Sequence, residues 1–386
     1  MNMIIQNVHL YLPDKTIKGS ILIEKGKIKA IGEALPTDHT QVMDGKGLHL
    51  IPGFIDAHIH GANGADMMDG TMDALDTMSR ILPAEGTTAY LPTTITNPLS
   101  AIEQSLETVS EYVEQGFNKP GQAEIVGVHL EGPFIEKTKA GAQPKEDIVQ
   151  PNIETFKQLQ QKASGLIKTV TLAPELDANG KLMTYLKENG VTVSAGHTNA
   201  TYEDIQFAYD KGLTQLTHLC NAMTGLHHRE VGVVGAAMLI EGLRSELIVD
   251  GIHVNKNMVR ILFQQLGPER IMLITDAMRA KCLDNGHYTL GGQSVRVKDQ
   301  MATLGDGTLA GSVLRMIDGA QHMMGFAGAT IRDVIKMASE NPANQIGIYD
   351  RKGSIEINKD ADLLLVDENL NLFSTWCRGE LSYVKE

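Results

Sequence analysis

From residue 53 onward, short apolar segments alternate with stretches that have the pattern of helices. Short apolar runs bounded by turn residues are typical of buried strands. The expected strands are 54–59, 87–95, 124–131, 168–174, 191–196, 213–219, 246–251 and 270–275. Strands that alternate with helices pair in parallel, and eight of them close most simply into a barrel. The sequence therefore predicts an α/β fold, a (β/α)8 TIM barrel.

The two ends of the chain and one internal segment depart from this alternation. Residues 1–52 and 353–386 contain short strands and turns without a helical pattern, and β-rich ends that flank a barrel most simply pack together. We therefore expect a small β-sandwich domain from both ends beside a barrel domain over 53–352. Residues 278–312 contain further short strands, which predict an insertion at the catalytic end of the barrel. The C-terminal strands are expected at 354–357, 363–366 and 372–377.

Composition limits the class of protein and its partners. The 386 residues are 42% hydrophobic and 21% charged, as in an ordinary globular protein. The formal net charge of -13 disfavours a nucleic acid or an anionic membrane as partner. Three widely spaced cysteines fit a reducing compartment, and the N-terminal residues lack the pattern of a secretory signal. Because no apolar run is long enough to span a bilayer either, we expect a cytoplasmic protein.

Histidines and carboxylates stand at the ends of several expected strands. His58 and His60 are two apart on one strand, so both imidazoles point to the same side, where a divalent cation could accept them. Glu131, His197 and His218 end three further strands and supply the ligand types of a catalytic zinc site with a position open for water. Function in such a barrel lies at the C-terminal ends of the strands, so we expect these side chains to meet there.

A carboxylate also ends the last expected strand. Asp276 follows an apolar run, and a buried carboxylate is costly unless it faces a cation, a histidine or a metal-bound water. We expect Asp276 to take a proton from that water and to return it to a leaving amine. His129 shares a strand face with Glu131, for which we predict packing or support of a ligand.

Several segments carry motifs of a known family. Residues 52–61, PGFIDAHIHG, resemble the first-strand signature of the amidohydrolase superfamily. Further blocks resemble the N-acetylglucosamine-6-phosphate deacetylase family within it: HLEGPF at 129–134, GHT at 196–198, THL at 217–219, NAM at 221–223, DGIH at 250–253, TDA at 275–277 and LAGS at 309–312. The resemblance runs from the first barrel strand to the last.

The resemblance implies metal-dependent hydrolysis of the N-acetyl group of N-acetyl-D-glucosamine 6-phosphate, giving glucosamine 6-phosphate and acetate. It implies that Glu131, His197 and His218 bind the primary ion and that Asp276 is the catalytic acid and base. Family members that keep both first-strand histidines can hold a second ion, so we expect one or two divalent ions per subunit. We favour Zn2+, with Fe2+, Mn2+ and Co2+ as alternatives for histidine and carboxylate ligands.

The resemblance also implies a set of substrate contacts. They are expected from Ala142, Asn221, Ala222, Arg229, His253 and Leu309. His253, which we also count as catalytic, would lie beside the sugar and the acetyl carbonyl. Asn221, Ala222 and Arg229 would receive the phosphate, in part across the interface of a homodimer. Two departures bear on this expectation: Gln143 stands where the family commonly has histidine, and the stretch 224–228 varies within the family.

Other interpretations remain open at this level. A deacetylase of N-acetylgalactosamine 6-phosphate differs by the recognition of one hydroxyl group. A hydrolase of cyclic amides usually bridges two metals with a modified lysine, but no lysine ends a strand here. A catalytically inactive scaffold should have lost ligands or the acid, yet all the candidates are present.

Overall fold

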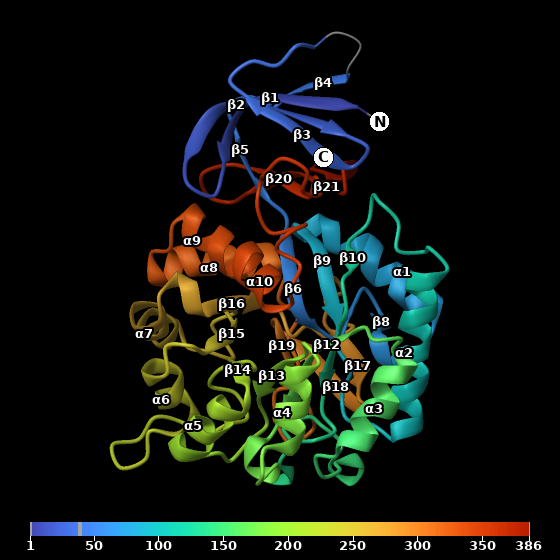
Figure 1. Ribbon diagram of the computed structural model, residues 1–386, viewed down its shortest axis with the longest axis vertical. Helices are drawn as coiled ribbons and strands as arrows, with labels where there is room; N and C mark the ends of the chain where they lie inside the picture. Colours follow the sequence, from blue (N-terminus) through green and yellow to red (C-terminus); the bar gives the residue numbers. More distant parts are fainter. Residues whose placement is uncertain (1, 38–40, 386) are drawn as a thin grey trace.

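The computed structural model describes residues 2–37 and 41–385 and contains a closed parallel barrel (Figure 1). Its strands are β6 (Phe54–Ile59), β9 (Thr87–Pro92), β10 (Glu124–Ile125), β11 (Val128–Glu131), β12 (Ile167–Leu172), β13 (Thr192–Ala195), β14 (Leu213–Leu216), β15 (Arg244–Ile248) and β16 (Ile271–Ile274). The expected strand 124–131 is split into β10 and β11, which occupy one barrel position.

Backbone hydrogen bonds close the barrel between its two sheets, β10-β9-β6 and β11 to β16. On one side, the amide of Thr94 donates to the carbonyl oxygen of His129 at 3.0 Å. On the other, the amide of Asp276 donates to the carbonyl oxygen of His58 at 2.8 Å. Parallel pairing joins each neighbouring pair of strands within both sheets. The predicted TIM barrel is therefore confirmed.

Helices surround the barrel. They are α1 (Met72–Ile81), α2 (Leu99–Glu114), α3 (Ile153–Lys162), α4 (Lys181–Glu188), α5 (Tyr202–Lys211), α6 (Gly232–Leu239), α7 (Lys256–Leu266), α8 (Met316–Ala327), α9 (Ile331–Ile335) and α10 (Asn341–Gln345). The sequence pattern does not predict α6, because this segment is apolar nearly all round and most of its residues are buried. The other helices lie where strand–helix alternation places them.

Both ends of the chain meet in one eight-stranded sheet. Its strands are β1 (Met3–Tyr11), β2 (Thr16–Glu24), β3 (Lys27–Gly32), β4 (Gln41–Asp44), β5 (His49–Pro52), β20 (Leu363–Val366), β21 (Leu372–Cys377) and β22 (Glu380–Val384). Antiparallel pairing of β5 with β20, in which Leu50 lies opposite Leu365, joins the two ends. Figure 1 shows this sheet at one end of the molecule. The β-sandwich form and the division into two domains stay predictions.

Two details of the terminal strands differ from expectation. The strand expected at 354–357 is wrong: the segment is irregular, and Ile355 is buried beneath the sheet rather than paired in it. β22, which the sequence analysis did not predict, forms the edge strand beside β21. Its residues are largely exposed, so the strand lacks the apolar run that marks a buried strand.

Three antiparallel strands form within the expected insertion: β17 (Gly286–Leu290), β18 (Gln293–Lys298) and β19 (Met301–Thr303). Their apolar side chains share a small buried cluster with Ile95 and Ala142, which follow strands at the C-terminal end of the barrel. A two-stranded ribbon of β7 (Gly61–Ala62) and β8 (Ala65–Asp66) follows β6 at the same end. The three-stranded sheet and the β7–β8 ribbon therefore lie beside the C-terminal ends of the barrel strands.

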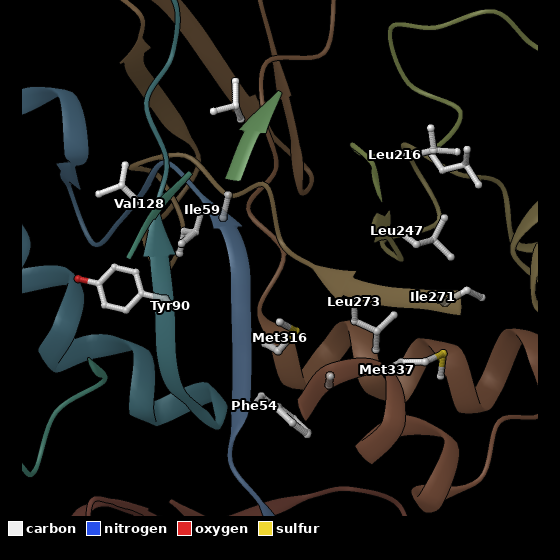
Figure 2. Close-up of a cluster of buried hydrophobic side chains, with 14 of the residues drawn as sticks. Phe54, Ile59, Tyr90, Val128, Leu216, Leu247, Ile271, Leu273, Met316 and Met337 are labelled. Atoms are coloured by element: carbon white, nitrogen blue, oxygen red, sulfur yellow. The ribbon is translucent and has the colours of Figure 1, made fainter. Parts of the chain in front are cut away.

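A large apolar core holds the barrel strands against their helices (Figure 2). Strand residues such as Phe54, Tyr90 and Leu273 are fully or almost fully buried in it, as is Met316 of α8. Burying one large apolar side chain contributes about 1.5–3 kcal/mol, so the strand ends have a stable support. No helix in the described ranges is long and apolar enough to cross a membrane.

Candidate metal centre and active site

The C-terminal end of the barrel gathers six of the predicted side chains. They are His58, His60, Glu131, His197, His218 and Asp276, and all are buried. Each comes from the end of a barrel strand or from the first residues beyond it. His197, His218 and Asp276 have φ values of 48°, 32° and 48°, which non-glycine residues adopt rarely and at a cost of about 1–3 kcal/mol each. The chain therefore accepts backbone strain where it positions these groups.

Three of these side chains form a compact set around one carboxylate oxygen. The Nε2 atoms of His197 and His218 lie 3.2 and 3.1 Å from Oε1 of Glu131. The same two Nε2 atoms lie 3.1 Å from each other. Ligands that share one ion at about 2.0–2.2 Å stand roughly 3–3.5 Å apart, so this set has the spacing of a metal site.

A second set of ligands shares the same glutamate. Nε2 of His60 lies 3.4 Å from Oε2 of Glu131 and 3.1 Å from Oδ1 of Asp276. Nε2 of His58 lies 3.6 Å from Oε1 of Glu131 and 3.4 Å from the same Asp276 oxygen. Glu131 thus stands between the two sets of potential ligands. Its Oε1 faces His197, His218 and His58, and its Oε2 faces His60.

The side chains themselves fit a divalent ion. Within the described chain, the buried Nε2 of His58 has no hydrogen-bond partner, although it points toward two carboxylates. His58, His60 and Glu131 form one group of atoms close enough to hold an ion, and Glu131, His197 and His218 form another. Imidazole nitrogen with carboxylate oxygen suits zinc and the other divalent first-row metals. The geometry therefore accommodates one ion or two.

Electrostatics keep the carboxylate of Asp276 ionised. Burial would raise the pKa of Asp276, but His58 and His60 lower it to about 2. The opposite holds for His58. Burial would lower its pKa, but Asp276, Glu131 and Glu246 raise that pKa well above its usual value. The carboxylates of the centre therefore favour positive charge beside them, whether on an imidazole or on a bound cation.

A cavity of about 330 Å³ opens beside the centre, a size typical of small-molecule sites. Five predicted substrate residues line the cavity: Ala142, Asn221, Ala222, His253 and Leu309. The candidate metal ligands His60, Glu131, His197 and His218 line it as well, and so does Asp276. His58 lies behind this lining and is fully buried. The cavity thus brings the candidate metal ligands and most of the candidate substrate contacts to one place.

Arg229 lies outside this cavity in its own chain. It is exposed on a short hairpin in which His227 pairs with Glu230. Its guanidinium Nη1 lies 2.8 Å from Nε2 of His228. The structure therefore does not bring Arg229 together with the other predicted site residues of the same chain.

His253 reaches the cavity with a carboxylate behind it. Its Nδ1 lies 2.6 Å from Oδ2 of Asp250, and the other oxygen of Asp250 accepts hydrogen bonds from the amides of Ile252 and His253. Burial would lower the pKa of His253, but Asp250 outweighs this effect and raises it. His253 is thereby biased toward its charged form, which can donate a hydrogen bond to a substrate oxygen.

Two residues that sequence reasoning did not place in the site contact the candidate ligands. Gln143 donates from Nε2 to Oε2 of Glu131 at 2.8 Å, and its Oε1 accepts from the amide of Thr96 at 2.7 Å. The sequence feature that could have indicated Gln143 is that it replaces the histidine common in the family at this position. Glu246 contacts Nδ1 of His58 at 2.9 Å. Its sequence signal is a charged residue in the mostly buried strand β15, which a search confined to strand ends does not find.

His129 lies below the centre, within the barrel. Its Nε2 lies 2.7 Å from Oγ1 of Thr171, and its Nδ1 lies 3.2 Å from the carbonyl oxygen of Ala57. Both ring nitrogens therefore have partners that are not candidate metal ligands. The position is compatible with both predicted roles, packing and support of a ligand.

Residues 49–384 match the amidohydrolase family, so the chain belongs to that family. More specific similarity extends over the full length. The chain is 43% identical to N-acetylglucosamine-6-phosphate deacetylase of Bacillus subtilis (strain 168), covering 100% of this chain and 98% of that protein. It is 36% identical to N-acetylgalactosamine-6-phosphate deacetylase of Escherichia coli O157:H7, covering 86% and 87%.

The fold agrees with these relatives. The crystal structure of N-acetylglucosamine-6-phosphate deacetylase from Pasteurella multocida superposes with a TM-score of 0.92 at 30% identity, covering 100% of both chains. This similarity includes the terminal strands as well as the barrel, because the whole chain is covered. The resemblance inferred from the motifs is therefore confirmed.

Proposed function

We propose that this enzyme hydrolyses the N-acetyl group of N-acetyl-D-glucosamine 6-phosphate, giving glucosamine 6-phosphate and acetate. The observation that carries the proposal is the set of two histidines and Glu131 beside Asp276 at the wall of one cavity. Relatives with this activity in their names support the substrate. Glu131, His197 and His218 would hold a divalent ion, which would polarise a carbonyl oxygen and lower the pKa of water.

Asp276 carries the proton in this reaction. Its lowered pKa keeps the carboxylate ionised, so it accepts a proton from the water whose oxygen adds to the acetyl carbonyl carbon. When the carbon–nitrogen bond breaks, Asp276 gives that proton to the departing nitrogen, and the products are acetate and the free amine. His253, biased toward its charged form, orients the substrate by donating a hydrogen bond from the cavity wall.

The separation of the residues expected to bind the phosphate favours a homodimer. Asn221 and Ala222 line the cavity, whereas Arg229 stands on an exposed hairpin. An arginine that faces the cavity of a second subunit would supply the planar donors that phosphate prefers. Leu226, beside the same hairpin, is 55% exposed and Leu239, the last residue of α6, is 62% exposed, as apolar residues of a subunit interface are in an isolated chain.

Three finer assignments belong to the proposal. Zinc is the proposed metal, with iron(II), manganese and cobalt as the alternatives that the same ligand types accept. N-Acetylgalactosamine 6-phosphate is the second candidate substrate, and the relative from Escherichia coli O157:H7 favours it. A cytoplasmic location fits the three free cysteines of the described chain.

The test combines metal analysis with acetate release. Protein purified without added metal is analysed for divalent metals, and acetate release is then measured with each of the two sugar phosphates. We expect bound metal, chelator-sensitive activity and a higher kcat/KM for the gluco substrate. A higher value for the galacto substrate would select the alternative, and absence of activity on both would refute the proposal.

A further inference from the structure

We propose that Glu246 is a positioning residue that holds the two halves of the metal centre in register. This inference rests on the proposed metal-dependent function and extends it to a residue outside the cavity. Glu246 lies on β15 inside the barrel and is 0% exposed, so it does not touch substrate. Its action must pass through the ligands.

The side chain of Glu246 contacts a ligand of each half. Oε2 lies 2.9 Å from Nδ1 of His58, a ligand of the second set. The same oxygen accepts a hydrogen bond from the backbone amide of His218, a ligand of the first set, at 3.2 Å. The backbone carbonyl oxygen of Glu246 accepts from the amide of Leu219 at 2.9 Å, which fixes the segment on the other side of His218. One residue thus ties β6 to the turn after β14.

The contact with His58 determines which nitrogen of that ring can bind metal. A carboxylate at Nδ1 keeps the ring proton there and leaves the lone pair on Nε2, which points toward Glu131 and Asp276. Such a partner also increases the basicity of a metal-binding imidazole. The partners at Nδ1 of His60 and His197 are carbonyl oxygens of Thr93 and Lys139. Among these histidines, His58 therefore has the charged partner.

A merely structural role explains the buried charge poorly. Gln215 donates from Nε2 to Oε1 of Glu246 at 2.7 Å, but an amide would satisfy that contact equally well. In the part of the chain that the structure describes, the ion-pair partner of Glu246 is His58. A buried carboxylate is favourable when positive charge lies close by. A metal cation bound to Nε2 of His58 would place positive charge near Glu246, on the opposite side of the imidazole ring.

The experiment measures metal binding rather than turnover. Wild-type protein, Glu246→Gln and a matched control, Glu85→Gln, are stripped of metal and titrated with Zn2+ against a competing chelator, and native mass spectrometry counts the ions per subunit. Glu85 is also a buried carboxylate, paired with Lys281 at 2.5 Å, but it does not contact the ligands. Thermal unfolding of each protein reports general loss of stability.

We expect two ions in the wild type and a 10–100-fold loss of affinity for the weaker ion in Glu246→Gln, the size usual for removal of a ligand's partner. Glu85→Gln should lower stability without changing either affinity. Equal affinities in Glu246→Gln and wild type would overturn the inference, as would a single ion in the wild type. A wild type that binds no ion would instead refute the proposed function.

Glu246→Asp keeps the inference testable if the glutamine variant does not fold. The shorter side chain retains the charge but withdraws it from Nδ1 of His58. We expect the weaker ion to lose affinity in this variant too, and unchanged affinity in folded protein would overturn the inference. In a His58→Ala background, Glu246→Asp should cause no further loss at that ion, because the ring that transmits the effect is absent.

Discussion

Replacing Asp276 by Asn separates proton transfer from metal binding. Asparagine has nearly the same shape, so the backbone turn at this position and the cavity wall should persist. The set formed by Glu131, His197 and His218 does not include Asp276, and its atoms stay 3.1–3.2 Å apart. The variant should therefore keep its primary ion and lose the group that moves the proton.

The structure indicates the size of this loss. A single proton-transfer group contributes about 10²–10⁴-fold to rate. Asp276 acts twice in the proposed reaction, on the water and on the leaving nitrogen, so kcat should fall toward the upper end, by about 10⁴-fold. That factor corresponds to about 5.4 kcal/mol of activation free energy at 1.36 kcal/mol for each tenfold. The substrate contacts are untouched, and KM should change little.

The assay follows acetate release, metal content and substrate binding in the same preparation. Asp14→Asn, which changes an exposed carboxylate in the turn between β1 and β2, serves as the matched control and should behave like the wild type. A loss confined to KM would reassign Asp276 to substrate binding. Retention of normal kcat in metal-loaded Asp276→Asn protein would refute its role in proton transfer.

Three further outcomes follow from the site. His197→Ala should lose the primary ion and nearly all activity, because the ring supplies one direct bond to it; full metal occupancy with normal turnover would contradict the assignment. Arg229→Ala should weaken binding of the sugar phosphate by about 2–4 kcal/mol, read as KM, and leave the unphosphorylated sugar unaffected; equal loss on both would indicate a structural role. Asp250→Asn removes the group that raises the pKa of His253. If charged His253 is required, kcat/KM falls as pH rises through that pKa, so the fall should move to lower pH in the variant; an unchanged profile would exclude charged His253.

The candidate ligands could be located from the sequence because two simple rules of strand geometry apply to them. Side chains two apart on a strand share a face, which brings His58 and His60 together. Parallel strands end at one rim, which brings Glu131 and His218 from distant parts of the chain to the same place. Neither step needs knowledge of side-chain packing. The barrel and the gathering of these residues were predictable for the same reason.

Other features depend on contacts that a linear pattern does not contain. α6 has no polar face, so its periodicity is lost, and it is helical because it packs between neighbouring helices. Glu246 sits inside a strand, where its role arises from a side chain two barrel positions away. Gln143 reaches Glu131 from a loop. The role proposed for Arg229 requires a second subunit, which no single chain specifies.

The direction of β6 has a practical consequence for handling the protein. β5 of the terminal sheet leads through Gly53 directly into β6, which carries His58 and His60 at its far end. The sheet that contains the first and last strands, β1 and β22, therefore covers the N-terminal end of the barrel, and Figure 1 shows it at one pole of the molecule. The cavity opens at the opposite end of the strands. An affinity tag, a fused partner or a solid support attached at either terminus should therefore leave the entrance for small molecules free.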